Sequence, residues 1–452
     1  MNHEALYEKS SPIRLFFIVG IPSIISMLMS SLYMVIDGVF VGQIIGSQAL
    51  AALNIVLPLV ILCFALSDLV GVGSSVPIAI HLGEKNYKTA NEIFSLSCIL
   101  IIVTGFITGG ILLLFAEKFM IYMGADGELL SLCKQYLLPY ALLSPFISIF
   151  FAVDNFLRIC GKVKYSMWVN ISMAVEGIIL EWLFLRVLGW GIWAAALAFC
   201  LSMVISTIIA FYPFFRKKLL LQFVRPKGSL KLIGNIIASG SPALLSNISG
   251  RVVSILINSY LLRQGGDLAV AAYSVMLYIE GIVYSVIYGL NDSLQPAIGY
   301  NYGAKNNKRI KDIMKILYSA SFIISIAITA WLLLGGEHAV LLFVKAEEVA
   351  LVQLSLHAIK LFSITFAFRW FTSVTGTYFT AINRPGYAIS ITTSMSFLFP
   401  ILLLLFLPSW LGLDKIWLTM PIATILASIL TICFLIYEKY KKKHFYLKNK
   451  TT

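Results

Sequence analysis

Charged residues are scarce in this chain of 452 residues. They make up 12% of it, about half of their share in soluble domains, whereas hydrophobic residues make up 59%. Apolar runs of twenty or more residues recur along the whole length, each long enough to cross a bilayer, and no sizeable soluble domain fits between them. The composition therefore predicts an all-α polytopic membrane protein, whose first apolar run is an uncleaved span and not a signal peptide.

Common motifs of metal, disulfide and nucleotide chemistry are also missing. The six cysteines are scattered without a C-x-x-C pair, and the five histidines show no metal-ligand spacing. No Gly-rich phosphate loop of the Walker type is present, so ATP hydrolysis is excluded. We expect no cofactor and no bound metal, and the energy for any pumping would have to come from an ion gradient.

Twelve spans and their connections set the expected topology. The spans lie near residues 13–40, 49–80, 91–115, 130–157, 165–188, 192–215, 231–262, 268–299, 312–334, 349–381, 386–408 and 415–438. Most lysines and arginines fall in connections on one side, including the tail 439–450, and this bias predicts a multi-pass cell-membrane protein with both termini cytoplasmic. The net charge of +13 then predicts contact with membrane lipids and no nucleic-acid partner.

An internal repeat divides the spans into two sets of six. Three segment pairs share an offset of 220 residues, namely Gly20-Ile-Pro22 with Gly240-Ser-Pro242, residues 46–52 with 266–272, and residues 81–86 with 301–306. The two sets have the same orientation, so the repeat is parallel. We expect two six-helix lobes, 1–220 and 221–452, joined by a cytoplasmic link over residues 215–231.

These segments carry a family resemblance. The runs VIDGVFVGQIIGSQALAALNIVLPL and NFLRICGKVKYSM in the first half, with GDLAVAAYS and LQPAIGYNYGAKNNKRIK in the second, resemble the MATE (multidrug and toxic compound extrusion) family over nearly the whole chain. The resemblance implies two lobes that face each other across a central cavity and alternate between outward-open and inward-open states. It implies an antiporter, not an enzyme, that exports small-molecule drugs or organic cations in exchange for H⁺ or Na⁺. We expect the chain to act as a monomer.

A polar stripe follows the first span. Ser26, Ser30, Tyr33 and Asp37 are spaced by four, three and four residues, so they fall on one face of a helix. The stripe either packs against a neighbouring helix or lines an ion or substrate cavity. An ionisable group inside a membrane is costly unless it faces a bundle interior or water, and Asp37 therefore favours the cavity.

The fifth span carries a second buried carboxylate. Asn170, Gly177 and Glu181 share one face, and Glu181 is expected at the depth of Asp37, in the outer half of the membrane. Two carboxyl groups in a low-dielectric pocket can hold a proton near neutral pH. The family's cation-binding carboxylates align with these two. Glu176 points away from Glu181, toward either a separate surface or the central cavity.

Three positions depart from the family pattern. Gly177 stands where many members have Asn, and Phe199 stands where they have Thr, while Glu181 replaces an Asp. Neither Gly177 nor Phe199 supplies a side-chain oxygen, which a dehydrated Na⁺ needs. We therefore expect H⁺ to be the coupling ion.

Charges inside the second half leave two interpretations open. Lys360 and Arg369 on one span, with Glu280 and Asp292 on another, form either structural ion pairs or a polar patch that faces the substrate. In the first half, the spacing of Asp154 and Arg158 favours a structural ion pair.

Two alternative functions remain. A lipid-linked oligosaccharide flippase of the same superfamily would use a basic cavity, for which Arg251, Lys360 and Arg369 are candidates. A polytopic membrane enzyme would need an intramembrane catalytic group, and only His357 lies deep in a span.

Overall fold

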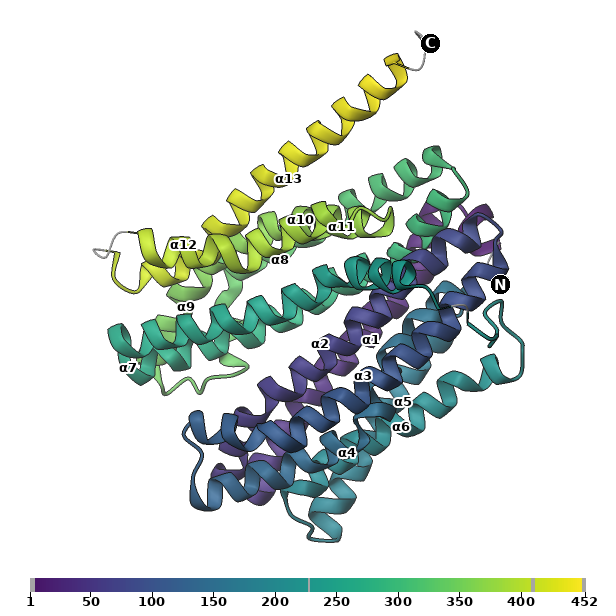
Figure 1. Cartoon of the computed structure of the whole chain (residues 1–452). Helices are drawn as coiled ribbons and strands as arrows, with labels where there is room; N and C mark the ends of the chain where they lie inside the picture. Colours follow the sequence, from purple (N-terminus) through teal and green to yellow (C-terminus); the bar gives the residue numbers. More distant parts are fainter. Residues whose placement is uncertain (1–4, 227, 408–410, 449–452) are drawn as a thin grey trace. The chain divides into compact units, whose positions relative to one another are not determined.

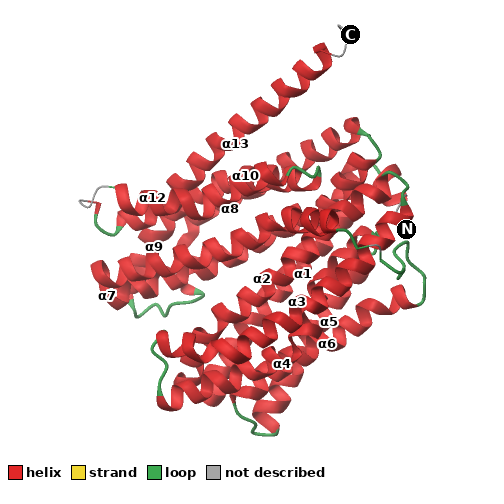
Figure 2. Cartoon of the chain, viewed as in Figure 1, coloured by secondary structure: helices red, strands yellow, loops and turns green. Residues whose placement is uncertain are grey.

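The computed structural model describes residues 5–226, 228–407 and 411–448, and no described residue lies in a strand (Figure 2). The side chain of Cys63 and the side chains of the basic tail beyond residue 441 lie outside the described part. The helices of the first half are α1 (Pro12–Phe40), α2 (Ser47–Gly83), α3 (Tyr87–Tyr122), α4 (Gly127–Ile159), α5 (Val163–Trp182) and α6 (Ile192–Phe215). Those of the second half are α7 (Leu230–Gly303), α8 (Asn307–Leu341), α9 (Val349–Phe362), α10 (Ile364–Ala381), α11 (Pro385–Thr393), α12 (Phe399–Phe406) and α13 (Asp414–Lys448) (Figure 1).

The number of spans agrees with the prediction once the breaks are considered. Ten helices in the described part are long and apolar enough to cross a membrane, and the pair α9 and α10, bent by 42°, raises the count to eleven. Helix α7 runs for 74 residues but is interrupted at Gly266, whose φ of 63° and ψ of −160° are not helical. A positive φ suits glycine. With α7 divided there into the two expected spans, the eleven become twelve, and the all-α polytopic fold is confirmed.

The described residues form two compact units, and the first is built around α4. This unit comprises Met1–Asn247, Tyr288–Ile313 and Ala381–Asn383. Helix α4 packs against α2, α3 and α6, while α5 packs against α1 and α6. In its most apolar window, 72% of the residues of α4 are buried, a larger share than in the other spans. A helix that is apolar on several faces is buried in this way, and α4 is the centre of the first unit.

The repeat is visible in how α2 and α7 cross inside the first unit. A Cβ atom added at Gly83 would lie 1.9 Å from the carbonyl oxygen of Tyr300, and one added at Gly303 would lie 1.9 Å from that of Ile80. Ile80 and Tyr300, like Gly83 and Gly303, are separated by the repeat offset of 220 residues. Each repeat therefore supplies a glycine that lets the backbone of the other approach.

The repeated turn that follows each of these glycines has one local structure. Lys85 and Lys305 both adopt a left-handed conformation, with φ of 59° and 56°. The next residue caps the following helix, because Asn86 Oδ1 accepts a hydrogen bond from the Thr89 amide at 3.2 Å and Asn306 Oδ1 accepts one from the Arg309 amide at 3.1 Å. The internal repeat predicted from the sequence is therefore also a structural repeat, with the same turn and the same N-cap in both halves.

The link after α6 is fixed to the first unit by its backbone. The amide of Gln222 donates to Asn91 Oδ1 at 2.9 Å, and the amide of Val224 donates to Ser95 Oγ at 2.9 Å. Phe223 lies 4.9 Å from Phe94, centroid to centroid. The division into lobes 1–220 and 221–452 stays a prediction.

The second unit comprises Ile248–Ile287, Met314–Thr380 and Arg384–Thr452. Its apolar core includes Tyr273, Phe362, Phe366 and the fully buried Trp417. Helix α13 packs against α9 and α12. The core thus joins helices that are far apart in the sequence.

Candidate functional site

Three residues of the predicted stripe on α1 are buried and Ser30 is partly buried, but its hydroxyl groups have different roles. Ser26 donates to the Pro22 carbonyl at 3.0 Å, and Ser30 donates to the Ser26 carbonyl at 3.2 Å. Such bonds satisfy the hydroxyls within the helix, next to a proline that removes a backbone donor. Tyr33 and Asp37 instead face neighbouring helices, so the stripe is polar for two separate reasons.

Asp37 and Glu181 come together in the first unit, as the sequence predicted. Asp37 is 8% exposed and Glu181 is fully buried. The Asp37 carboxyl group is within hydrogen-bonding reach of Glu181 and of the Tyr136 hydroxyl, and the Tyr33 hydroxyl donates to Glu181 Oε2 at 3.5 Å. The other oxygen, Glu181 Oε1, is buried without a hydrogen-bond partner among the described residues. A buried carboxyl oxygen without a donor favours the uncharged form of the group.

The ring of Tyr33 fills the space beside Gly177. A Cβ atom added at Gly177 would lie 2.6 Å from Tyr33 Cε2. On α6, Phe199 stacks on Tyr33 with centroids 4.9 Å apart and an interplanar angle of 17°. Gly177 and Phe199, two of the three positions that depart from the family pattern, are thus explained together, since both contact one aromatic ring next to the carboxyl pair.

Two tyrosines of α4 complete the site and were not among the predicted residues. Tyr136 and Tyr140 are buried, and their hydroxyl oxygens are 3.5 Å apart. Tyr140 also lies 6.0 Å from Phe199, centroid to centroid. Their spacing of four residues puts them on one helix face, and this spacing is the feature of the sequence that could have identified them. The sequence does not show that this face packs against α1.

Glu176 lies apart from this pair. It is partly buried and lies near Ser206 on α6, and neither Glu176 Oε2 nor Ser206 Oγ has a hydrogen-bond partner among the described residues. The predicted separation from Glu181 is confirmed, and a role of Glu176 in coupling stays a prediction.

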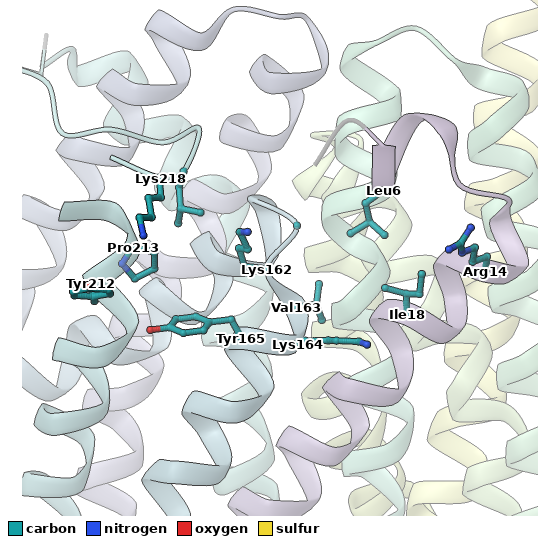
Figure 3. A pocket seen from close by; sticks show the side chains of 12 residues that line it. Leu6, Arg14, Ile18, Lys162, Val163, Lys164, Tyr165, Tyr212, Pro213 and Lys218 are labelled. Carbon is teal, nitrogen blue, oxygen red and sulfur yellow. The ribbon is translucent and has the colours of Figure 1, made fainter. Parts of the chain in front are cut away.

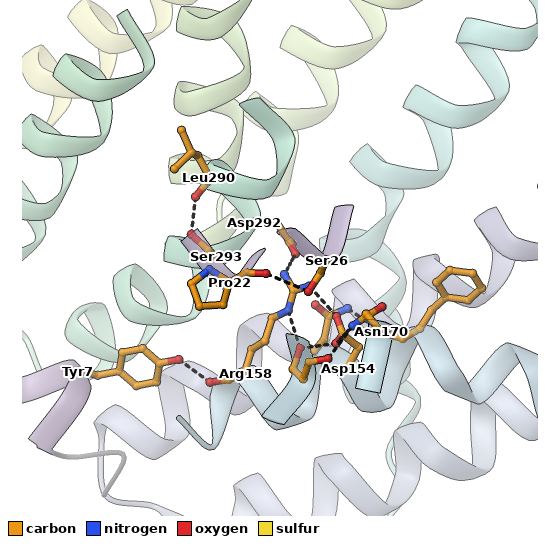
Figure 4. A network of polar contacts seen from close by, with 12 residues as sticks. Tyr7, Pro22, Ser26, Asp154, Arg158, Asn170, Leu290, Asp292 and Ser293 are labelled. Atoms are coloured by element: carbon orange, nitrogen blue, oxygen red, sulfur yellow. Dashed lines mark hydrogen bonds and ion pairs between the residues drawn. The ribbon is translucent and has the colours of Figure 1, made fainter. Parts of the chain in front are cut away.

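A second network surrounds Arg158 at the end of α4 (Figure 4). Arg158 is 2% exposed, and its Nη2 lies 2.7 Å from Asp154 Oδ2, which confirms the predicted ion pair. Its Nη1 pairs with Asp292 on α7. Asp154 also accepts hydrogen bonds from Ser166 and from Asn170 Nδ2, the latter at 2.8 Å. The structure therefore places Asn170 in this network and not beside Glu181.

The segment before α1 is attached to the same network. The Tyr7 hydroxyl donates to the Arg158 carbonyl, and the Tyr7 carbonyl accepts from Asn301 Nδ2 at 3.1 Å and from Arg309 Nε at 2.8 Å. Burial raises the pKa of the Tyr7 hydroxyl well above its usual value, so it stays a donor. Residues of the chain start therefore bridge the ends of α4, α7 and α8.

In the second unit, Glu280 and Arg369 form the predicted interhelical ion pair. The Arg369 guanidinium also lies 4.8 Å from the ring centroid of Tyr284. Asp292 instead pairs with Arg158 of α4, so the interpretation that it pairs with a base of the same half is wrong. Lys360 is exposed and forms no ion pair with a described carboxylate. Whether Glu280, Lys360 and Arg369 face a substrate stays a prediction.

The histidine considered for an enzyme lies at the surface. His357 Nε2 is 2.7 Å from Asp414 Oδ1, and the two side chains are 52% and 42% exposed. This contact joins His357 to an exposed carboxylate and brings no buried catalytic group to the histidine.

Comparisons with known proteins match this architecture. A family model described as MatE matches residues 22–183 and 242–406. The multidrug export protein MepA of Staphylococcus haemolyticus (strain JCSC1435) is 27% identical over 448 residues, which cover 97% of this chain and 96% of that protein. MepA of Staphylococcus aureus (strain MSSA476) is 26% identical over 386 residues, covering 83% and 85%.

Solved structures show the same fold. A multidrug resistance MATE family transporter of the MOP superfamily, in an outward-facing conformation, has a TM-score of 0.90, 23% identity and 96% coverage of both chains. A MATE crystal structure in a bent conformation has a TM-score of 0.90 and 22% identity, with 98% of both chains covered. At such identities the likeness concerns the fold alone.

Proposed function

This chain belongs to the MatE family of export transporters, and on that premise we propose that it exports small-molecule drugs or organic cations from the cell in exchange for H⁺. The family is one of transporters and not of enzymes. The relatives named as multidrug export proteins support the substrate class, since the alignment with one of them covers nearly the whole chain.

The observation that carries the proposal is the contact between Asp37 and Glu181. An ionised carboxylate only accepts hydrogen bonds, so two carboxyl groups within hydrogen-bonding reach bond to each other only when at least one of them holds a proton. Both groups are buried, and two unpaired negative charges this close would be expensive in a low-dielectric site. The pair can therefore take up and release a proton as its access to water changes.

The surroundings of the pair support H⁺ over Na⁺. A dehydrated Na⁺ takes several oxygen ligands. Here the space beside Gly177 is occupied by the Tyr33 ring, and Phe199 contributes a ring in place of an oxygen. A proton needs only the carboxyl groups themselves.

Exchange follows if the drug favours the deprotonated pair. Each ligand then weakens the binding of the other by the same coupling free energy. Protonation from the outside would release the drug outward, and deprotonation toward the cytoplasm would prepare the pair for the next drug molecule.

Efflux from proteoliposomes tests the coupling ion. Release of a cationic dye would be followed under a pH gradient without Na⁺, and then under a Na⁺ gradient at constant pH. We expect transport in the first case only. Glu181→Gln and Asp37→Asn should each bind dye but lose gradient-driven efflux, whereas Glu128→Gln, which changes an exposed carboxylate of α4, should transport normally. Dye efflux that follows Na⁺ and ignores pH would contradict the proposal.

The topology completes the proposal, with both termini cytoplasmic and a monomer as the working unit. Tags at the two termini and within 216–230 should be accessible only from the cytoplasm, and tags within 186–190 and 263–267 only from outside. The positive-inside charge bias supports this orientation. An external C-terminus would contradict it.

A further inference from the structure

A cavity of about 610 Å³ opens in the first unit where three helices begin or end (Figure 3). Its walls come from the start of α1, the turn between α4 and α5, and the end of α6. The lining includes four cations, Arg14, Lys162, Lys164 and Lys218. We propose that this cavity binds the phosphate headgroup of an anionic phospholipid.

The charge of the lining points to an anion. Arg14, Lys162, Lys164 and Lys218 all line the cavity, and the lining residues that the structure describes include no carboxylate. No carboxylate in the described part of the chain forms an ion pair with any of these four cations. Like charges held near one another repel, and a bound anion would remove that repulsion.

The cations reach the cavity from three separate segments of the chain. Lys162 and Lys164 flank the first residue of α5, Arg14 lies in the first turn of α1, and Lys218 follows α6. Figure 3 shows them around the cavity and not along one helix face.

The apolar part of the lining selects a lipid over free phosphate. Ile18, Val163 and Pro213 line the cavity together with the rings of Tyr165 and Tyr212. The Tyr165 hydroxyl donates to the Ile209 carbonyl at 2.6 Å, so its ring is held in place. Basic pockets between membrane helices at the cytoplasmic end bind anionic headgroups in this manner, and this end is the one predicted to be cytoplasmic.

Native mass spectrometry of the full-length protein, released from detergent, tests the site. The probes are phosphatidylglycerol, which carries one negative charge, and phosphatidylcholine, which is neutral overall. We expect tighter binding of phosphatidylglycerol to the unchanged protein. The variant Lys162→Gln, Lys164→Gln, Lys218→Gln should lose at least tenfold in affinity, since each lysine near an anionic headgroup contributes about fivefold.

A matched control removes three exposed lysines from the same predicted side. Lys88→Gln, Lys308→Gln, Lys311→Gln changes the net charge equally but leaves the cavity intact. This control should bind phosphatidylglycerol as the unchanged protein does. Equal losses in the two triple variants, or no loss in the first, would overturn the proposal.

Competition with soluble glycerophosphate distinguishes a lipid headgroup from a soluble phosphate ester as the ligand. It should compete poorly with phosphatidylglycerol, because it lacks the acyl chains that the apolar lining would contact. Competition at equal concentration would overturn the lipid assignment in favour of a soluble phosphate.

A labelling experiment covers the case in which the triple variant does not fold. In nanodiscs of phosphatidylglycerol, acetylation of Lys162, Lys164 and Lys218 in the unchanged protein should be slower than in nanodiscs of phosphatidylcholine. Lys88, Lys308 and Lys311 provide the reference rates. Equal slowing of both sets would overturn the proposal.

Discussion

The ring of Tyr33 lies where the side chain of residue 177 would be, since a Cβ atom at Gly177 would come within 2.6 Å of Tyr33 Cε2. Phe199 covers the ring from α6 at 4.9 Å. The ring of Tyr33, which belongs to α1, thus lies between α5 and α6, next to the carboxyl pair. Any group that enlarges position 177 must displace this ring and, with it, the hydroxyl that donates to Glu181.

Gly177→Ala should therefore destabilise the protein by about 1–3 kcal/mol, the usual cost of overpacking. Thermal unfolding in detergent would measure the loss. Tyr33→Leu, which shortens the side chain, should recover part of it in the double variant. Gly38→Ala on α1 is the matched control, because an added Cβ there meets nothing within 4 Å. A neutral Gly177→Ala would contradict the packing described for Tyr33.

Arg158→Gln should lower stability far more than an exposed arginine does. The change leaves the partly buried Asp154 and Asp292 without their cation, and breaking a buried pair costs about 3–5 kcal/mol. Arg225→Gln, on the exposed link, should stay within about 0.5 kcal/mol of the unchanged protein. Urea or thermal unfolding of the purified variants measures both changes.

A double-mutant cycle isolates the contact of Arg158 with Asp292. Adding Asp292→Asn to Arg158→Gln removes one of the unpaired charges, so the double variant should be less destabilised than the sum of the single changes. Strict additivity would show that the two side chains do not interact.

Glycine at the repeated turn should stabilise the protein. Lys85 and Lys305 have φ of 59° and 56°, a region that is costly for a residue with a Cβ atom. Lys85→Gly and Lys305→Gly should each gain about 0.5–1 kcal/mol in the free energy of unfolding. Lys88→Gly, two residues into α3, should instead lose stability. A loss for Lys85→Gly as large as for Lys88→Gly would contradict the strain argument.

The Cys160 thiol should report unfolding. Burial raises the pKa of this thiol to about 12, so only about one molecule in ten thousand carries the thiolate at pH 8. Iodoacetamide should then label Cys160 only after the protein unfolds. Because folding keeps the thiol neutral, its contribution to stability is complete below pH of about 8.5 and declines as the pH rises toward 12. Mass spectrometry of labelled peptides measures the rate, and rapid labelling of the folded protein at pH 8 would contradict the prediction.

Periodicity along single helices predicted part of the site. Asp37 on α1 and Glu181 on α5 could be placed at one depth because each lies late in an outward span, and they do meet. Asn170 and Glu181 share a face as predicted, but eleven residues of helix separate them by about 16 Å. Asn170 consequently reaches Asp154 instead.

The sequence did not show which helix faces pack against one another. Tyr136 and Tyr140 looked like ordinary residues of a buried span, and only the packing of α4 brings them toward Asp37. Gly177 was interpreted as a missing oxygen ligand, whereas its local role is to make room for Tyr33. Asp292 found its partner on α4 because the end of α7 belongs to the first unit. Each of these depends on tertiary contacts that no single helix encodes.

The crossing of α2 and α7 has a consequence for how such a chain can arise. One half contains both a glycine at position 83 and a carbonyl at position 80, and the other half has the same two groups at 303 and 300. Two copies of a single half could therefore form this contact twice across an isologous interface. In each contact, one copy would supply the glycine and the other the carbonyl group that packs against it. A homodimer of six-helix chains would already possess the crossing, and fusing its two genes would need no new packing there.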